Sequence, residues 1–458
     1  MTGILVLYIV AFALFIYGLM GLTGPRTAVR GNLIAAAGMG IAVFATLLIP
    51  GVSNWVLIIL GILIGTALGV PSAKQVKMTA MPQMVALFNG VGGGAVALIA
   101  WVEFNSTAGF TLEPEAHVVV ASLFGAIVGS VSFWGSLVAF GKLQELIPGR
   151  PISLGRPQQI VNALVLVAAL ACAIAIGLGN GSPLLILGTL IFAAALGLLV
   201  VLPIGGADMP VVISLLNALT GLSAAAAGLA LNNTAMIVAG MIVGASGSIL
   251  TNLMAKAMNR SIPAIVAGGF GGGGAPGARE LGDKTVRETN AADAAVQMAY
   301  ANQVVVVPGY GMAVAQAQHT VRDMAKLLED KGVEVKYAIH PVAGRMPGHM
   351  NVLLAEADVP YEQLKEMDEI NGEFNRTDVA LVIGANDVTN PAARNDPSSP
   401  IHGMPILNVD ESKSVIVLKR SMNPGFAGIE NELYYSPTTS MLFGDAKSSV
   451  ESVIEELK

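Results

Sequence analysis

The sequence contains one cysteine and few charged residues. Cys172 is the only cysteine among 458 residues and lies within an apolar stretch, so a disulfide framework and a cysteine-rich metal site are excluded, and we expect no bound metal. Only 12% of the residues are charged and 54% are hydrophobic, a balance typical of membrane proteins. The chain is therefore expected to lie largely in a lipid bilayer.

Charged residues are scarcest in the first part of the chain. Residues 1–260 carry 9 of the 25 Lys and Arg and 5 of the 31 Asp and Glu, which leaves 16 and 26 for residues 261–458. The second part resembles a mildly acidic soluble domain, and nothing in it suggests nucleic-acid binding. The glycine-rich run 268–278 has no strand before it and no Lys-Ser or Lys-Thr after it, which favours a linker. We predict a transmembrane domain at 1–260, a linker at 261–290 and a soluble domain at 291–458.

Nine apolar stretches in the first part are each long enough to cross a bilayer, which takes about 20 helical residues. They lie near residues 4–22, 32–50, 55–72, 83–101, 117–140, 158–178, 183–204, 209–230 and 234–256. The first stretch lacks the basic start of a signal peptide and is predicted to be retained. All nine Lys and Arg of this part fall in connections on one side. Because basic loops stay inside, the N-terminus is predicted to be outside and the soluble domain cytoplasmic.

A few polar residues interrupt the predicted spans. Asn89, Asn217 and Ser246 lie near the middles of the fourth, eighth and ninth spans, and Asp208 lies at the cytoplasmic end of the eighth. An unpaired polar group is costly in lipid, so either hydrogen bonds between helices or a hydrated polar path explains these residues. No span contains a well-buried ionisable residue, so a complete proton relay is not visible in this chain.

The second part alternates between helical and strand-like patterns. We predict helices at 291–301 and 311–330, and strands at 304–307, 333–340, 378–384, 405–410 and 414–420. Strands that alternate with helices favour a parallel sheet covered on both faces, so the predicted fold is a Rossmann-like, doubly wound α/β domain after a polytopic helical membrane domain.

A glycine motif follows the first predicted strand directly. Gly309 is expected to permit a tight turn and Gly311 to let the backbone approach a pyrophosphate, while the next helix offers free N–H groups to phosphates. Val314 replaces the third glycine of the usual motif, which serves helix packing. An ordinary strand, turn and helix without a ligand remains the alternative.

The end of the second predicted strand bears on the choice between NAD and NADP, because an NAD site usually has an Asp or Glu there. The second predicted strand ends at His340 without the Asp or Glu that binds the ribose 2′-hydroxyl of NAD. Lys419, Arg420 and Ser421 end a later strand and could bind a 2′-phosphate, although a solvated strand end would also explain them. Together these features favour NADP. His340 and His349 lack a nucleophile or carboxylate nearby, so we assign them structural roles in loops.

Several long segments resemble one family, the β subunit of proton-translocating NAD(P) transhydrogenase. They lie at residues 205–212, 256–261, 309–317, 340–348, 367–371, 382–387, 419–422 and 441–447. The resemblance covers nearly the whole chain. It implies a Re/Si-specific transhydrogenase in which this chain binds NADP(H) in reversed orientation and supplies most of a proton path.

The resemblance also implies which residues bind the nucleotide. Lys419, Arg420 and Ser421 would contact the 2′-phosphate, and residues 424–428 would form part of a lid. Asp387 would lie near the nicotinamide and couple protonation to NADP(H) binding and release. The implied binding residues are Tyr310, Val342, Ala343, Gly344, Arg345, Met346, Pro347, Gly384, Ala385, Asn386, Asp387, Val388, Lys419, Arg420, Ser421, Met422, Asn423, Pro424, Gly425, Phe426, Asp445 and Ala446. Gly309, Gly311 and Val314 of the glycine motif complete the predicted set.

The implied partner is an α subunit that carries an NAD(H)-binding domain and further membrane helices, in a dimer of the α–β unit in a prokaryotic inner membrane. Many relatives have a membrane histidine where this chain has Asn89, and histidine is the side chain whose pKa suits proton transfer. Either a partner helix supplies the titrating group or the pathway differs. An ion channel or carrier gated by a redox-sensing nucleotide domain is the main alternative, and a non-catalytic assembly subunit is another.

Overall fold

The computed structural model divides the chain into two compact units. Residues 1–204 with 212–251 form the first, termed the helical unit, and residues 205–211 with 252–458 form the second, termed the sheet unit. The structure describes residues 2–111, 115–148, 151–155, 157–205, 208–258, 261–268, 285–345, 348–397, 399, 401–423 and 429–458. Most of the glycine-rich run 268–278 lies outside the described residues.

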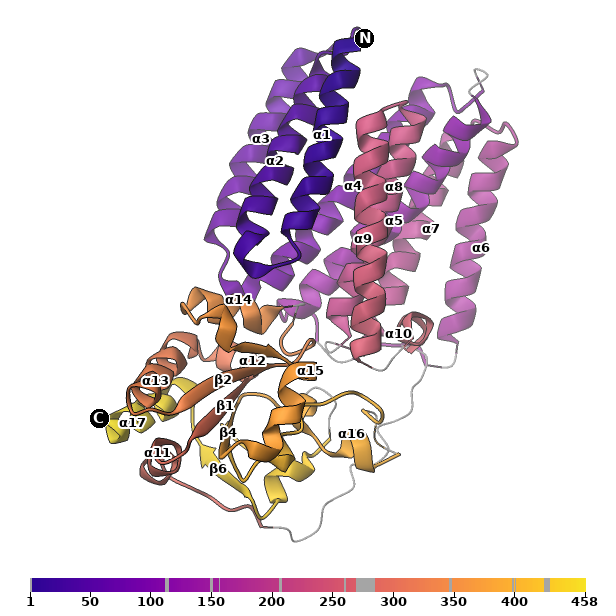
Figure 1. Ribbon diagram of the computed structural model, residues 1–458. Helices are drawn as coiled ribbons and strands as arrows, with labels where there is room; N and C mark the ends of the chain where they lie inside the picture. The colour runs from indigo at the N-terminus through magenta and orange to yellow at the C-terminus, as the bar shows by residue number, and fades with distance from the viewer. Residues whose placement is uncertain are drawn as a thin grey trace. The chain divides into compact units, whose positions relative to one another are not determined.

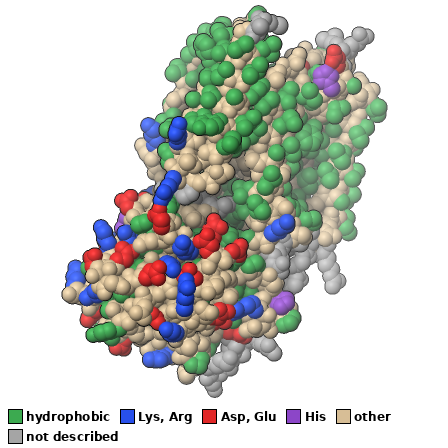
Figure 2. All heavy atoms as spheres, viewed as in Figure 1, with side chains coloured by type: hydrophobic (Ala, Val, Ile, Leu, Met, Phe, Trp, Pro, Cys, Tyr) green, Lys and Arg blue, Asp and Glu red, His purple; other side chains and the backbone are tan. Residues whose placement is uncertain are grey.

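Nine helices of the described chain are long and apolar enough to cross a membrane, which confirms the nine predicted spans (Figure 1). They are α1 (Thr2–Gly21), α2 (Pro25–Leu47), α3 (Trp55–Gln75), α4 (Met81–Ser106), α5 (Ala116–Leu143), α6 (Gln158–Gly177), α7 (Pro183–Val201), α8 (Met209–Ala230) and α9 (Thr234–Ala257). Figure 2 shows hydrophobic side chains over most of the visible face of the helical unit. Such a surface is suited to lipid.

Helix ends differ from the predicted spans in one respect. Helix α2 begins at Pro25 and not near residue 32, because a proline at the first helical position has no N–H to leave unpaired. Arg26 therefore lies in a first helical turn, and Lys74, Lys142 and Lys256 lie in the last turns of α3, α5 and α9. These basic residues belong to helix ends and not to the connections. Which side of the membrane they face stays a prediction.

Small residues bring the helices of this unit together. A methyl group added at Gly93 of α4 would lie 2.8 Å from the carbonyl oxygen of Gly129 on α5. One added at Gly240 of α9 would lie 2.4 Å from the amide nitrogen of Ala225 on α8. Glycine at these positions lets the backbones approach closely, which is how membrane helices gain packing contacts.

The sheet unit contains a six-stranded parallel sheet of order β3-β2-β1-β4-β5-β6. The strands are β1 (Gln303–Pro308), β2 (Glu334–Ile339), β3 (Leu364–Glu366), β4 (Val379–Ile383), β5 (Ser414–Lys419) and β6 (Thr439–Phe443). Every residue of β1 and β4 is buried, as expected for central strands covered on both faces. This order confirms the predicted Rossmann-like fold.

The described chain also contains shorter α-helices and 3₁₀ turns, most of which lie between these strands. The α-helices are α10 (Ile262–Gly268), α11 (Ala291–Ala299), α12 (Tyr310–Val314), α13 (Gln318–Asp330), α14 (His349–Glu356), α15 (Met367–Ile370), α16 (Ala392–Asn395) and α17 (Ala446–Leu457). The 3₁₀ turns are η1 (Met78–Ala80), η2 (Tyr361–Gln363), η3 (Asn371–Arg376), η4 (Asp387–Thr389), η5 (Val409–Glu411) and η6 (Glu432–Tyr435). Of those that do not lie between strands, η1 lies between α3 and α4, α10 and α11 precede β1, and α17 follows β6.

Two predicted elements of this unit are wrong. The helix expected at 311–330 is divided into α12 and α13, because Gln316 has a left-handed φ of 52° that interrupts the helix. The strand expected at 405–410 is absent from the described structure. Pro405 has no N–H, and its carbonyl accepts a hydrogen bond from the His340 side chain instead of from a neighbouring strand. Strands β3 and β6 were not predicted.

Candidate functional site

The order of the strands reverses between β1 and β4, and the turns that follow these two strands meet at the carboxyl edge of the sheet. The amide of Gly309 donates to the Ile383 carbonyl at 2.8 Å, and the amide of Gly311 donates to the Gly384 carbonyl at 3.0 Å. A switch point of this kind is where open parallel sheets bind ligands. The candidate site is therefore the set of loops around this edge.

Glycine is required at this edge by contact between the two turns. A methyl group added at Gly309 would lie 2.4 Å from the Ala385 Cα, and one added at Gly311 would lie 2.7 Å from the Gly384 Cα. Gly384 also has a left-handed φ of 66°. Gly309 has an extended φ of −134°, so backbone contact and not its own turn conformation explains this glycine. The sequence pattern alone did not reveal this contact.

The loop after β2 is held by two buried histidines. The His340 Nε2 atom donates to the Pro405 carbonyl at 2.8 Å, and its Nδ1 atom accepts from the Val342 amide at 3.2 Å. The His349 Nδ1 atom accepts from the Arg345 amide at 3.1 Å. These contacts confirm the structural roles that the sequence predicted for the two histidines.

The same loop places Arg345 on an aromatic ring of the glycine turn. The Arg345 guanidinium carbon lies 4.3 Å from the centre of the Tyr310 ring, and the rings of Tyr310 and His349 are 6.1 Å apart. A cation this close to a ring is attracted to its face. The loop after β1 and the loop after β2 thus form one surface. Met346 and Pro347, which were also predicted to bind, lie outside the described residues.

Both histidines are held neutral in the folded protein. Burial lowers the pKa of His340 to about 4, against a smaller opposing effect of the Pro405 carbonyl. Burial, aided by the positive charge of Arg345, lowers the pKa of His349 to about 4. An unfolded chain would bind these protons near the ordinary histidine pKa of about 6.5.

We therefore expect the sheet unit to lose stability as the pH falls from about 6.5 to about 4. Within this window the unfolded state binds more protons than the folded state, so each histidine contributes a loss on the order of 3 kcal/mol, and below it no further loss. Denaturant unfolding of the full chain across this pH range measures the loss. His340→Gln should flatten the profile, while His319→Gln, at an exposed position on α13, should not. Equal pH profiles for all three proteins would contradict the account.

The loop after β4 is anchored by buried amides. Asn431 donates through Nδ2 to the Asn386 carbonyl at 3.0 Å, and Asn390 donates to the Glu430 carbonyl at 3.0 Å. The Leu407 amide donates to the Val388 carbonyl at 2.9 Å. These bonds fix the turn that contains Asp387. Asn390 and Asn431 were not predicted as site residues.

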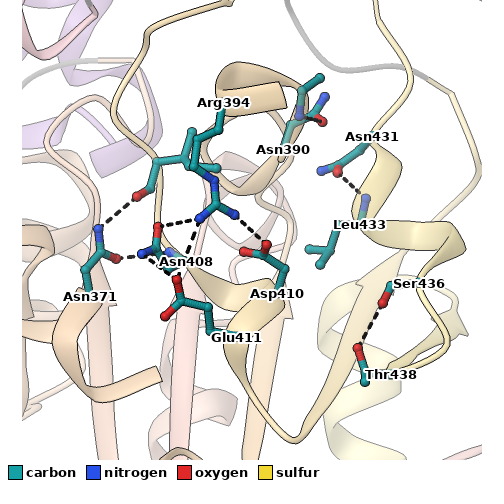
Figure 3. A network of polar contacts seen from close by, with 12 residues as sticks. Asn371, Asn390, Arg394, Asn408, Asp410, Glu411, Asn431, Leu433, Ser436 and Thr438 are labelled. Carbon is teal, nitrogen blue, oxygen red and sulfur yellow. Dashed lines mark hydrogen bonds and ion pairs between the residues drawn. The ribbon is translucent and has the colours of Figure 1, made fainter. Parts of the chain in front are cut away.

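A second polar network lies around Arg394 of α16, further along the connection that begins with this loop. Arg394 donates to Asn408 at 3.3 Å and pairs with Asp410 and Glu411, while the Asn408 amide donates to Asn371 at 3.0 Å (Figure 3). The network joins α16 to the segment around η5 within the connection between β4 and β5, and joins that segment to Asn371 of η3, so it holds this long connection in place.

Lys419 lies at the end of β5 and is half-buried. Its Nζ atom donates to the Asn423 carbonyl and lies 5.1 Å from the centre of the Tyr434 ring. Burial lowers the pKa of Lys419, and the negative charge of Asp387 opposes part of this effect. The predicted phosphate-binding lysine and the predicted coupling aspartate therefore act on each other electrostatically.

The remaining predicted residues lie in different surroundings. Arg420, Ser421 and Asn423 are exposed and Met422 is half-buried. Asp445 caps α17 by accepting from the Lys447 amide at 3.0 Å, and Ala446 begins that helix. Val314 is 46% exposed, and Val342 and Ala343 lie in the loop after β2. Pro424, Gly425 and Phe426, with the rest of the predicted lid at 424–428, lie outside the described residues.

The helical unit contains a second candidate site around Asn89. The Asn89 amide donates to Ser136 at 2.9 Å and to Ser132 at 3.3 Å, which joins α4 to α5. The Ser132 hydroxyl contacts the Thr220 hydroxyl and donates to the Leu216 carbonyl of α8 at 3.1 Å. Asn89 Oδ1 is buried without a partner in the described chain. Ser132, Ser136 and Thr220 were missed, although Ser132 and Ser136 stand four residues apart on one helical face.

The other predicted polar residues lie outside this cluster. Asn217 of α8 and Ser246 of α9 are exposed on the described chain, and the Ser246 hydroxyl donates only weakly, at 3.3 Å, to the Val243 carbonyl. Asp208 immediately precedes α8. The structure thus separates the buried Asn89 cluster from Asn217 and Ser246, which are exposed on the described chain.

The fold and the site define a class: polytopic membrane proteins that carry a Rossmann-like domain on the same chain. A family model described as NAD(P) transhydrogenase beta subunit matches residues 4–456. Two sequences from Rhodospirillum rubrum, both named NAD(P) transhydrogenase subunit beta, are 49% identical over 98% of this chain and 98% of their own length. The chain belongs to the NAD(P) transhydrogenase beta subunit family, which confirms the resemblance. It is a membrane oxidoreductase subunit.

Proposed function

We propose that this chain binds NADP(H) and, with an α subunit that binds NAD(H), couples hydride transfer between NADH and NADP⁺ to proton translocation. The observation that supports the proposal is the close backbone contact between the turn after β1, at Gly309 and Gly311, and the turn after β4, at Gly384 and Ala385, at the carboxyl edge of the sheet. Strand β5 ends at Lys419 on the same edge. Family membership supports the pairing of the two nucleotides.

The residues at this edge fit a phosphorylated dinucleotide. Lys419, Arg420 and Ser421 offer two cations and a hydroxyl in succession, a donor set suited to a 2′-phosphate. The His349 Nε2 atom is buried without a partner among the described residues, and it carries the proton because Nδ1 accepts from the Arg345 amide. A buried donor of this kind is suited to an acceptor from a ligand or a water.

Each binding residue has a distinct part in the proposed site. Lys419, Arg420 and Ser421 hold the 2′-phosphate, Arg345 lies against Tyr310, and Asp387 lies toward the reacting end. When bound, NADP(H) supplies the hydride acceptor or donor. The protein orients the nucleotide and excludes water from it, and the residues of this chain take no hydride.

In the helical unit we propose that the Asn89 cluster forms part of the proton path. Its free Oδ1 atom and the hydroxyls of Ser132, Ser136 and Thr220 can order water across three helices. Asparagine does not titrate, so a group on the α subunit binds the proton. Helices of the α subunit would cover Asn217 and Ser246, since exposed polar groups are costly in lipid.

The proposed organisation keeps the domain boundaries predicted above, with the transmembrane domain at 1–260, the linker at 261–290 and the NADP(H)-binding domain at 291–458. The proposed location is a prokaryotic inner membrane, with the N-terminus outside and the binding domain in the cytoplasm. The proposed assembly is a dimer of the α–β unit.

Arg420→Gln is expected to weaken NADPH binding by about tenfold to a hundredfold, because a charge-assisted bond to phosphate is worth about 1.5–3 kcal/mol. NADH, which lacks the 2′-phosphate, should lose little affinity. Fluorescence titration of the full-length chain in nanodiscs with each nucleotide measures both values. Arg287→Gln removes another exposed arginine as a control and should leave both unchanged.

A different outcome would favour a rival function. Equal affinity of the unmodified chain for NADPH and NADH, or no affinity for either, would remove the basis of the proposal and favour an assembly subunit. Nucleotide-gated movement of another ion without hydride transfer would favour a channel or carrier.

A further inference from the structure

Tyr434 is a buried residue that the sequence did not mark as part of the site. It lies in η6, which follows the predicted lid in the sequence, and only 2% of its surface is exposed. Its hydroxyl donates to the Asn386 side-chain oxygen at 2.8 Å. Asn431 donates to the same oxygen at 3.2 Å. Asn386 directly precedes Asp387, so the tyrosine hydroxyl holds the turn that presents the aspartate.

The ring of the same tyrosine contacts the other end of the site. The Lys419 ammonium lies 5.1 Å from the ring centre, within the range of a cation–π attraction. Lys419 also donates to the Asn423 carbonyl, which fixes its side chain over the ring. One rigid side chain thus contacts a phosphate-binding residue with its face and the aspartate turn with its hydroxyl.

The Tyr434 hydroxyl is always the donor in its hydrogen bond with Asn386. Burial raises the pKa of Tyr434, against a smaller opposing effect of a hydrogen bond with Asn431, and the negative charge of Asp387 adds to the rise, so the phenol keeps its proton across the physiological range. The Asn386 oxygen has no proton to give. The direction of this hydrogen bond is therefore fixed, and the link does not depend on a proton being gained or lost.

We propose that Tyr434 is a positioning residue that links the two ends of the NADP(H) site, so that the contact of Lys419 with the 2′-phosphate sets the position of the Asn386–Asp387 turn. This inference rests on the proposed function. It assigns part of the discrimination between NADPH and NADH to a residue that touches neither nucleotide. NADH does not engage Lys419 through a 2′-phosphate, so the link contributes to NADPH binding alone.

Tyr434→Phe tests the link because it keeps the ring over Lys419 and removes only the hydroxyl. The ratio of NADPH affinity to NADH affinity should fall by about fivefold, the effect of losing one neutral hydrogen bond. A purely structural role would weaken both nucleotides equally and leave the ratio unchanged. Tyr435→Phe is the matched control, since the neighbouring hydroxyl donates to Glu430 at 3.4 Å and not to the turn.

A double-mutant cycle with Lys419→Met completes the test in the full-length chain in nanodiscs. If the ring transmits the lysine contact, Tyr434→Phe should change the affinity ratio by less than about twofold once Lys419 is replaced. The same fivefold effect in both backgrounds, or an unchanged ratio in Tyr434→Phe, would overturn the inference. Failure of the unmodified chain to prefer NADPH would instead overturn the proposed function, so the two failures are distinguishable.

Discussion

Gly309→Ala will open the carboxyl edge of the sheet and abolish measurable NADPH binding. The added methyl group would lie 2.4 Å from the backbone of Ala385, where no flexible side chain can move aside. Overpacking of this kind costs about 3 kcal/mol when the neighbour is backbone. The turns after β1 and β4 would separate, and the binding loops would lose their common edge.

Hydrogen exchange of the full-length chain measures this opening at the amides that join the two turns. The Gly309 and Gly311 amides, which donate to Ile383 and Gly384, should exchange about a hundredfold faster in the variant. Gly372→Ala is the matched control, since a methyl group there meets no atom within 4 Å. Unchanged exchange and unchanged NADPH affinity in Gly309→Ala would show that the contact is not what holds the site.

Asn89→Leu will strongly reduce proton translocation by the assembled complex while the chain still binds NADPH. Leucine fills a similar space but cannot donate to Ser132 and Ser136, and it leaves their hydroxyls facing an apolar side chain. Loss of the only amide in the cluster should reduce proton uptake by about tenfold or more, the effect of about 1.4 kcal/mol on the barrier. In a tightly coupled enzyme the hydride-transfer rate should fall with it.

Proton uptake and hydride transfer are measured side by side in vesicles that hold the complete complex. Asn105→Leu is the matched control on the same helix, because the Asn105 amide donates to the Trp101 carbonyl at an exposed position. It should translocate protons normally. If Asn89→Leu also did so, the proton path would have to run elsewhere.

The fold could be predicted from the sequence where periodicity is strong. Nine long apolar runs predicted nine helices, and the all-apolar run of β1 predicted a central strand. Strand β3 has three half-exposed or exposed residues, so its pattern is no different from that of a loop. The segment near Pro405 reads as a strand because it is apolar, yet its apolar residues are buried in a connection.

Residues of the candidate site could be predicted from the sequence only where they belong to a sequence motif. Gly309 and Lys419 belong to recognisable motifs, whereas Asn390, Asn431 and Tyr434 act through contacts across the sheet edge that no local pattern records. In the helical unit, Asn217 and Ser246 were predicted from the sequence by their depth in the membrane spans. Their central positions suggested buried partners, but both are exposed on this chain, since helix rotation and not depth decides which face a residue occupies.

The central claim is that hydride transfer and proton passage belong to one cycle. In vesicles with the unmodified complex, an inward proton gradient should accelerate hydride transfer from NADH to NADP⁺, since each charge that crosses 100 mV releases about 2.3 kcal/mol. Proton uptake should occur only when both nucleotides are present. The same rate with the gradient imposed and with it collapsed by an uncoupler would contradict the account.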